Sequence, residues 1–318
     1  MSRARTLVVG AAGFVGGHLI AELLGGGYSD VSAAKLPSER LSEGRSSRVS
    51  VHDVDVLDPA SVDRLIRAVR PTRLVHLAAQ SSVAQSWTDP AATFSLNVNG
   101  ALHVLDAVRA VVPACRVLLV GSAEQYGRVR PEDLPVRETC VLAPENPYAV
   151  SKMAQEQTAR LYVAAYGMDI LMVRAFNHIG PGQSPAFVVS GFARQVARIE
   201  RGLQPPVVSV GNLSARRDFT DVRDVVRAYA LLLEKGRAGE VYNVGQGRSV
   251  GVDEVLDALI SRCRVPVTVT VDPALFRPVD VPDVVADVTR LQGETGWTPR
   301  VPLAKSLDDT LAYWREHD

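Results

Sequence analysis

The sequence predicts an α/β protein with a doubly wound parallel sheet and a smaller second domain. Short apolar runs bounded by turn residues alternate with longer amphipathic stretches over about the first 175 residues. A glycine-rich turn directly follows the first of these runs. Repeated strand and helix of this kind indicates parallel strands covered by helices on both faces.

The expected elements follow in chain order. We expect strands at 6–10, 73–79, 116–122 and 169–176, and helices at 16–25, 97–111 and 151–166. After about residue 175 the chain becomes rich in Pro, Gly and Asp, which indicates loops and small elements on the substrate side. A helix in 218–236 and a strand in 240–245 return it to the first domain. We therefore predict one domain from 1–173 and 218–246, and another from 174–217 and 247–318.

Composition limits the class of protein. The chain has 318 residues, of which 47% are hydrophobic and 22% are charged, enough for a large core in one or two domains. Basic and acidic residues number 35 each, so no net charge favours nucleic acid or an anionic membrane as partner. The scattered Cys115, Cys140 and Cys263 fit no disulfide framework. Glycines interrupt the apolar N-terminal run and no long apolar span follows, so we expect a cytoplasmic protein without a membrane segment.

The glycine turn predicts a dinucleotide cofactor. Gly10, Gly13 and Gly16 follow the first strand and open a helix, with Phe14 and Val15 between them. Glycine there permits a tight turn and lets backbone N–H groups at the helix start approach a pyrophosphate. The GxxGxxG spacing differs from the better-known GxGxxG, and such turns also occur for packing alone.

The strand end that we expect near Ala34 and Lys35 bears on which nicotinamide cofactor binds. NAD-binding folds usually place a carboxylate there for the ribose hydroxyls. In this chain the segment around Ala34 and Lys35 has none, whereas Lys35 and Arg40 are suited to a 2′-phosphate. We expect NADP(H), with NAD(H) as the alternative; the competing interpretation is that both cations are simply solvated.

At this point the sequence resembles the extended short-chain dehydrogenases/reductases, in particular their nucleotide-sugar enzymes. The resemblance covers nearly the whole chain. It rests on the glycine turn, "DVLD" at 55–58, "HLAAQ" at 76–80, "NVNG" at 97–100, "GSAEQYG" at 121–127, "PYAVSK" at 147–152, "RAFNHIGPGQ" at 174–183, "RRDFTDVRDVVRAY" at 216–229, "YNVG" at 242–245, "RPVDVP" and "TGWTP". It implies a Rossmann domain, a substrate domain, a nicotinamide cofactor and a Ser/Thr–Tyr–Lys catalytic set.

The resemblance assigns roles by position. Asp55 and Val56 match the adenine pocket, Leu77, Ala78 and Ala79 the strand end along the cofactor, and Asn97 a further cofactor contact. By match, the substrate contacts are Gln80, Ser81, Ser82, Asn177, Val188, Arg217 and Arg277, the two arginines holding the diphosphate. Surface ion pairs with Asp218 and Asp280 are the alternative for these arginines. No metal site is expected, because His178 has no partner at ligand spacing.

Ser122, Tyr148 and Lys152 predict carbonyl reduction. Hydride transfer to a ketone leaves an alkoxide that needs a proton, and a phenol supplies one if a nearby cation lowers its pKa. Lys152 stands four residues after Tyr148 on the same helix face, and Ser122 is placed to polarise the carbonyl oxygen. A YxxxK pair alone is usually an aromatic ring and a solvated charge. The glycine turn and Ser122 favour the catalytic interpretation.

The choice among family reactions depends on two residues after Ser122. A 4,6-dehydratase needs an additional acid and base. Glu124 provides one carboxylate and is a candidate catalytic residue, but Ala123 cannot transfer a proton. The second half of the chain looks most like GDP-4-keto-6-deoxy-mannose reductases. The expected activity is therefore reduction of an NDP-4-keto-6-deoxy-hexose, with GDP as the favoured nucleotide and GDP-D-rhamnose as product. The alternatives are a 4,6-dehydratase or 4-epimerase, or a regulatory protein with a vestigial site. The resemblance also implies a homodimer.

Overall fold

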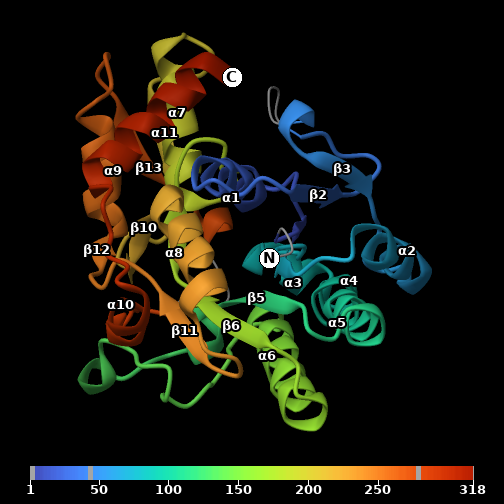
Figure 1. Cartoon of the computed structure of the whole chain (residues 1–318). Helices are drawn as coiled ribbons and strands as arrows, with labels where there is room; N and C mark the ends of the chain where they lie inside the picture. The colour runs from blue at the N-terminus through green and yellow to red at the C-terminus, as the bar shows by residue number, and fades with distance from the viewer. Residues whose placement is uncertain (1–3, 42–45, 277–280, 318) are drawn as a thin grey trace.

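A seven-stranded parallel sheet forms the centre of the protein, as the computed structural model shows (Figure 1). The structure describes residues 4–41, 46–276 and 281–317. The sheet confirms the predicted α/β class. Its strands, in spatial order, are β11 (Val241–Val244), β6 (Ile170–Ala175), β5 (Arg116–Ser122), β4 (Arg73–His76), β1 (Thr6–Val9), β2 (Val31–Lys35) and β3 (Ser50–Asp53).

Helices cover both faces of this sheet, because its central strands are apolar on both sides. In β1, Val8 packs into the core beneath α1 and α8, whereas Leu7 and Val9 face the opposite core. Alternate side chains of a strand point to opposite faces, so one apolar run serves both cores. The helices are α1 (Phe14–Gly25) and α8 (Val222–Lys235) on one face, and α2 (Pro59–Val69), α5 (Gly100–Val111) and α6 (Pro147–Tyr166) on the other.

The strand order reverses between β1 and β4. From β1 the chain proceeds outward through β2 and β3, and it then returns to β4 and proceeds the other way through β5 and β6. Ligands of open α/β sheets bind at the carboxyl ends of the strands where the order reverses in this way. The carboxyl ends of β1, β4 and β5 are therefore where a site is expected.

Short helices connect these elements near the same edge. The segment after β4 contains α3 (Val83–Thr88), α4 (Pro90–Phe94) and a π-helical turn, Ser95–Asn99, that leads into α5. Single-turn helices are Ser46–Arg48, Ala123–Tyr126, Pro131–Asp133 and Pro273–Leu275. No helix among the described residues is long and apolar enough to cross a bilayer.

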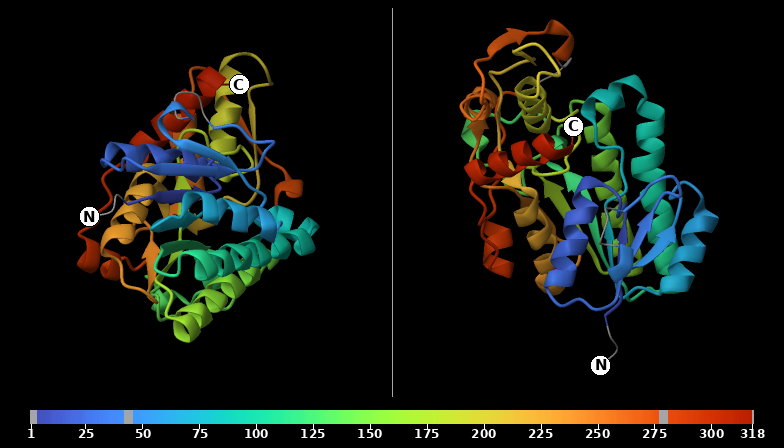
Figure 2. Two further views of the ribbon diagram at one scale, coloured as in Figure 1. Left: turned by 45° about the vertical axis from the view of Figure 1, so that its right-hand side comes forward. Right: turned by 90° about the horizontal axis from the view of Figure 1, so that it is seen from above.

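A second core lies beside the sheet. The helices α7 (Val188–Glu200), α9 (Val252–Ile260) and α11 (Leu303–His317) bury a separate apolar cluster, and in Figure 2 the red C-terminal helix lies beside the yellow α7. The expectation of loops and small elements missed α7, α9 and α11. The remaining elements are β7 (Asn177–Ile179), β8 (Val207–Val210), β9 (Arg216–Arg217), β10 (Phe219–Asp221), β12 (Val250–Gly251), β13 (Thr268–Val271) and α10 (Thr289–Thr295).

The chain crosses between the two cores more than once. The strand β11 pairs with β6 in the main sheet, so the return of the chain predicted at 240–245 is confirmed. Asp221 is the N-cap of the preceding helix α8, and its carboxylate accepts the Arg223 N–H at 2.8 Å, as is typical of an aspartate at a helix start. The domain boundaries given above stay a prediction.

Candidate active site

The glycine turn after β1 is shaped so that only glycine fits at two of its three positions. Gly10 has a φ of +86°, and a Cβ there would lie 2.6 Å from the Ala78 nitrogen at the end of β4. A Cβ on Gly16 would lie 2.5 Å from the Gly10 carbonyl oxygen. Both glycines therefore bring α1 and the end of β4 close to the turn.

Gly13 differs from its two neighbours in the turn. A Cβ there would meet only the Gly10 carbonyl oxygen, at 3.4 Å, so this side of the turn is open. Gly13 is also the N-cap of α1, which has no acidic residue in its first turn. Free N–H groups and the positive end of the helix dipole favour an anion at this place. The shape of the turn thus fits the pyrophosphate of a dinucleotide, and its role in binding stays a prediction.

The residues expected near the adenosine end lie around β2 and β3. Lys35 donates a 2.6 Å hydrogen bond to Asp53 on the adjacent strand, so its charge is already paired. Arg40 and Asp55 are exposed, and Val56 is buried against Gly100, where a Cβ would lie 2.9 Å from a Val56 methyl. A 2′-phosphate at this edge would share Lys35 with Asp53, so Arg40 is the more available cation.

Phe14 and His178 join the cofactor turn to the segment after β6. Their rings stack with centroids 6.0 Å apart and an interplanar angle of 13°. The Val15 side chain, next along α1, packs against the core on the same face of the sheet. The turn is therefore supported from the side of the "NHIGPGQ" loop, which no spacing in the sequence predicted.

Asn97 links the end of β4 to the helix that carries Tyr148. It is fully buried, accepts the Gln80 N–H at 2.8 Å and donates to the Gln80 carbonyl at 3.0 Å. Its amide also donates to the Ser151 hydroxyl at 2.9 Å, which in turn donates to the Tyr148 carbonyl at 2.7 Å. The structure thus gives Asn97 a positioning role between the loop beginning Leu77, Ala78 and Ala79 and helix α6.

The structure brings Ser122, Tyr148 and Lys152 together from two elements. Ser122 ends β5, and the other two lie in the first turns of α6, which begins where Asn146 accepts the Ala149 N–H at 2.8 Å. The Ser122 hydroxyl lies close enough to the Tyr148 hydroxyl to lower its pKa. Both side chains are largely buried, Ser122 at 7% and Tyr148 at 8% exposure. A carbonyl oxygen placed between the hydroxyls would meet two hydrogen-bond donors.

The acidity of Tyr148 differs from our expectation. Burial raises the pKa of Tyr148 to about 12, the hydrogen bond from Ser122 lowers it, and the charge of Glu124 raises it again. Lys152 does not lower the pKa of Tyr148 here. Burial lowers the pKa of Lys152 itself to about 7, so Lys152 is neutral at the pH where Tyr148 would lose its proton. Tyr148 therefore stays protonated over the neutral range, the form that a proton donor needs.

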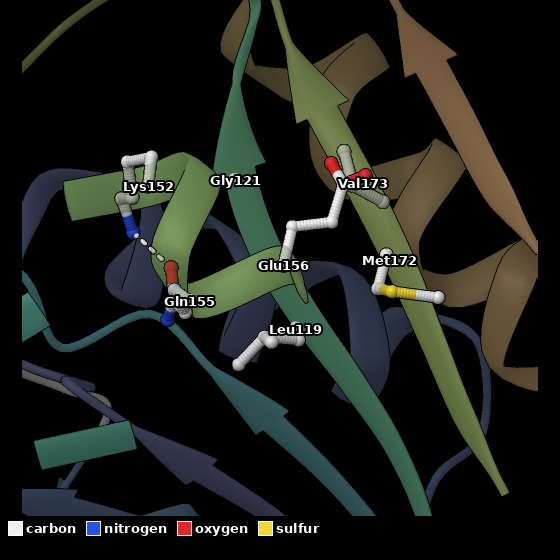
Figure 3. Close-up of a pocket in the computed structure, with 7 residues that line it drawn as sticks. All are labelled: Leu119, Gly121, Lys152, Gln155, Glu156, Met172 and Val173. Carbon is white, nitrogen blue, oxygen red and sulfur yellow. Dashed lines mark hydrogen bonds between the residues drawn. The ribbon is translucent and has the colours of Figure 1, made fainter. Parts of the chain in front are cut away.

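The Lys152 side chain is held by two hydrogen-bond acceptors, one on β5 and one on α6. Its ammonium donates to the Val120 carbonyl at 2.8 Å and to Gln155 Oε1 at 3.0 Å, and Figure 3 shows the second of these bonds. The space around them is lined by Leu119, Gly121, Glu156, Met172 and Val173 as well. Lysine has three N–H donors, so one remains for a ligand.

Glu124 is the fourth candidate catalytic residue, and it lies close enough to raise the pKa of Tyr148. Its carboxylate accepts the Asn146 amide at 3.0 Å, which fixes its direction. The neighbouring Ala123 is buried and has no group that transfers protons. The site therefore contains one carboxylate beside the phenol.

The candidate substrate residues fall into different surroundings. Gln80 is held by Thr93 and Ser82, and Ser81 and Asn177 are exposed. Val188 begins α7 and packs on the second core. Arg217 is 8% exposed and donates to the carbonyls of Arg216 at 2.7 Å and Val281 at 2.6 Å. Arg277 lies outside the described residues.

Sequence reasoning missed a buried polar cluster behind Ser122. Gln125, Glu156 and Arg174 are almost fully buried and hydrogen-bonded to one another in series. The available signal was Arg174, a charge inside the apolar run "ILMVRAF", since a buried charge needs a partner.

Comparisons with known proteins show to which family the chain belongs. The family model described as GDP-mannose 4,6 dehydratase matches residues 7–310. The chain is 37% identical to a GDP-6-deoxy-D-mannose reductase of Pseudomonas aeruginosa, over 98% of this chain and 97% of that protein. It superposes on the structure of RMD from P. aeruginosa complexed with NADPH with a TM-score of 0.87, at 35% identity, covering 99% of this chain and 100% of the other. For Thermus thermophilus UDP-glucose 4-epimerase with NAD the TM-score is 0.86, at 33% identity, covering 99% and 100%. The chain therefore belongs to the GDP-mannose 4,6 dehydratase family, within the extended short-chain dehydrogenases/reductases.

Proposed function

We propose that the protein is an NADPH-dependent 4-ketoreductase of nucleotide sugars that reduces GDP-4-keto-6-deoxy-D-mannose to GDP-D-rhamnose. The observation that carries the proposal is the buried Tyr148 side chain beside Ser122, with Lys152 one turn along the same helix. The full-length similarity to a GDP-6-deoxy-D-mannose reductase supports the choice of substrate.

The residues of the chain perform the proton-transfer half of this reaction. The nicotinamide, when bound, supplies the hydride that reaches the C4 carbon. Ser122 and Tyr148 donate hydrogen bonds to the C4 oxygen, which gathers negative charge as the hydride arrives. The phenolic proton of Tyr148 then passes to that oxygen and gives the alcohol. Lys152 supplies a proton-bearing group beside the phenolate that remains.

The cofactor-binding residues would be those of the turn and its neighbours. Gly10, Gly13 and Gly16 would face the pyrophosphate with Phe14 and Val15 behind them, and Arg40 together with Lys35 would bind the 2′-phosphate. The open side of Gly13 supports this assignment. Similarity to structures that hold NADPH and NAD supports NADP(H) as the preferred cofactor and NAD(H) as the alternative.

The proposed substrate contacts are the residues matched by position. Gln80, Ser81 and Ser82 follow β4, Asn177 is exposed on β7, and Val188 packs on the second core. Arg217 would hold the diphosphate, since a planar guanidinium makes paired hydrogen bonds to phosphate oxygens and this one is held in place by two backbone carbonyls.

We also propose a cytoplasmic homodimer that pairs through α5 and α6. Cys115, Cys140 and Cys263 are all free thiols, which suits a reducing compartment. On α6 the apolar Leu161 and Tyr166 are 67% and 55% exposed, which suits a face that a second copy covers.

Tyr148→Phe tests the proposed role directly. Loss of the proton donor should lower kcat for the ketosugar about 100- to 10,000-fold, with NADPH affinity little changed. Tyr162→Phe is the matched control, because Tyr162 lies on the same helix and its hydroxyl binds Asp106 at 2.9 Å, away from Ser122. Wild-type turnover by Tyr148→Phe would show that another group donates the proton.

A 4,6-dehydratase or 4-epimerase is the second candidate, and Glu124 is the observation in its favour. One carboxylate beside Tyr148 can remove a proton next to a ketone. The buried Ala123 leaves no second acid for loss of water. Both alternatives regenerate their cofactor, so consumption of NADPH separates them from the reductase.

A further inference from the structure

We propose that Gln125 is a positioning residue that sets the place of Ser122 relative to Tyr148 by connecting β5 to helix α6. The inference rests on the proposed catalytic role of Ser122. Gln125 itself is three residues beyond Ser122 and is fully buried, so it does not touch substrate.

The Gln125 amide bridges two groups that belong to different elements. Its Oε1 accepts the backbone N–H of Ser122 at 3.2 Å, and its Nε2 donates to Glu156 Oε2 at 2.8 Å. A carboxylate only accepts hydrogen bonds, so the amide nitrogen must face Glu156 and the oxygen must face Ser122. The orientation of the amide is thereby fixed.

Glu156 is itself held firmly by a buried arginine. Arg174 on β6 donates to the two carboxylate oxygens at 2.7 and 2.8 Å, and both side chains are 3% exposed. Arg174 also donates to the Tyr126 hydroxyl at 2.9 Å and to the Glu138 carbonyl at 3.0 Å. Burial raises the pKa of Glu156, but the bonds from Arg174 and Gln125 more than offset this and hold it below its usual value. The anchor for Gln125 therefore stays charged.

The anchor lies on the helix that carries the other two catalytic candidates. Glu156 is one turn beyond Lys152 and two turns beyond Tyr148, and Figure 3 shows its side chain reaching from α6 toward Val173 on β6. A helix is rigid over this length, so fixing Glu156 fixes Tyr148. Gln125 then ties the end of β5, and with it Ser122, to the same point.

Two further features depend on this bridge. A Cβ on Gly121 would lie 2.7 Å from Gln125 Oε1, so the glycine before Ser122 leaves room for the amide. Ser122 Oγ accepts the Glu124 N–H at 3.2 Å as the cap of the short turn Ala123–Tyr126, and Gln125 completes that capping box. The Glu124 N–H thus occupies one acceptor position of Ser122 Oγ. This contact helps to orient the Ser122 hydroxyl toward Tyr148.

Gln125→Met tests the inference, because methionine is similar in size and offers neither hydrogen bond. We expect kcat to fall about 10- to 100-fold, as for a small misplacement of a catalytic group, while KM for NADPH stays within about twofold. Gln195→Met is the matched control: Gln195 bridges the N–H and carbonyl of Ser209 at 2.8 and 3.0 Å, on α7 and β8 away from the site. The control should keep wild-type kcat.

A double-mutant cycle separates positioning from a general effect on folding. Ser122→Ala removes the hydroxyl that Gln125 is proposed to hold in place, so in that background Gln125→Met has no catalytic group left to displace. Once Ser122 is alanine, adding Gln125→Met should lower kcat by no more than about twofold, because both changes remove the same interaction.

The outcomes are distinguishable. If Ser122→Ala keeps wild-type kcat, the proposed catalytic role of Ser122 is wrong, and the premise of the inference with it. If Ser122→Ala is impaired but Gln125→Met behaves like Gln195→Met, or the two losses multiply, Gln125 does not act through Ser122. Gln125→Asn, one methylene too short to reach both partners, is the second variant if Gln125→Met does not fold, with the same expected pattern.

Discussion

Gly13→Ala separates cofactor binding from folding more cleanly than any other change in the glycine turn. Gly13 has a φ of −68° and a ψ of 168°, which alanine adopts without strain, and the new methyl would meet only the Gly10 carbonyl oxygen, at 3.4 Å. The fold should therefore accept it. If the pyrophosphate binds on the open side of Gly13, the new methyl stands against the phosphate in the complex. Overpacking of this kind costs about 1–3 kcal/mol, which raises the dissociation constant of NADPH about 5- to 150-fold.

Fluorescence titration with NADPH and a thermal melt without cofactor measure the two quantities. The Gly13→Ala melt should match wild type, whereas the affinity should fall. Gly25→Ala, on the same helix with no atom within 4 Å of the added Cβ, should change neither the affinity nor the fold. Gly16→Ala should unfold more easily, because its Cβ would lie 2.5 and 2.6 Å from two backbone oxygens. Wild-type NADPH affinity in Gly13→Ala would refute the placement of the pyrophosphate.

Three further changes test the buried groups around the site. Burial lowers the pKa of Lys152 from 10.5 to about 7. Between these pH values the unfolded chain therefore binds a proton at Lys152 that the folded chain does not. The free energy of unfolding should rise with increasing pH over this range, by up to about 1.4 kcal/mol per pH unit. Urea unfolding of wild type and Lys152→Met across this range should show that slope only in wild type. Arg174→Met leaves Glu156 buried without its partner and should lower the free energy of unfolding by about 3–5 kcal/mol. Arg160 contacts the same carboxylate but is 43% exposed, so Arg160→Met should lower it by less than about 1 kcal/mol. Equal losses for the two variants would contradict the buried pairing. Tyr229→Phe removes a buried hydroxyl that has no hydrogen-bond partner among the described residues, so unfolding should become harder by about 1 kcal/mol; a loss of stability would reveal a partner for that hydroxyl.

Much of the fold was predictable because local patterns decide it. The run at 6–10 followed by Gly10, Gly13 and Gly16 indicates a strand, a tight turn and a helix start, and each was found in place. The helix around "NPYAVSK" was predictable in the same way, since Asn146 and Pro147 are strong N-terminal signals. Helices α7, α9 and α11 were missed although their sequences are amphipathic, because the Pro- and Gly-rich segments between them dominated the interpretation.

The details of the site depend on contacts between distant parts of the chain, and these were not predictable. Lys35 faces Asp53 only because β2 and β3 pair in one register. Gln125 meets Glu156, 31 positions away, because β5 and α6 pack together. The direction of the Tyr148 pKa shift depends on burial, which a YxxxK spacing does not reveal. Residue types and spacing thus predicted the chemistry, whereas the tuning of each group required the structure.

The proposed function requires that the protein consumes one NADPH for each ketosugar molecule that it reduces. The most direct test is to incubate the purified protein with GDP-4-keto-6-deoxy-D-mannose and NADPH, follow the nicotinamide absorbance and quantify the sugar product. We predict loss of one NADPH per sugar converted and formation of GDP-D-rhamnose. Conversion of a nucleotide sugar without net loss of NADPH would contradict the reductase and indicate an epimerase or dehydratase instead.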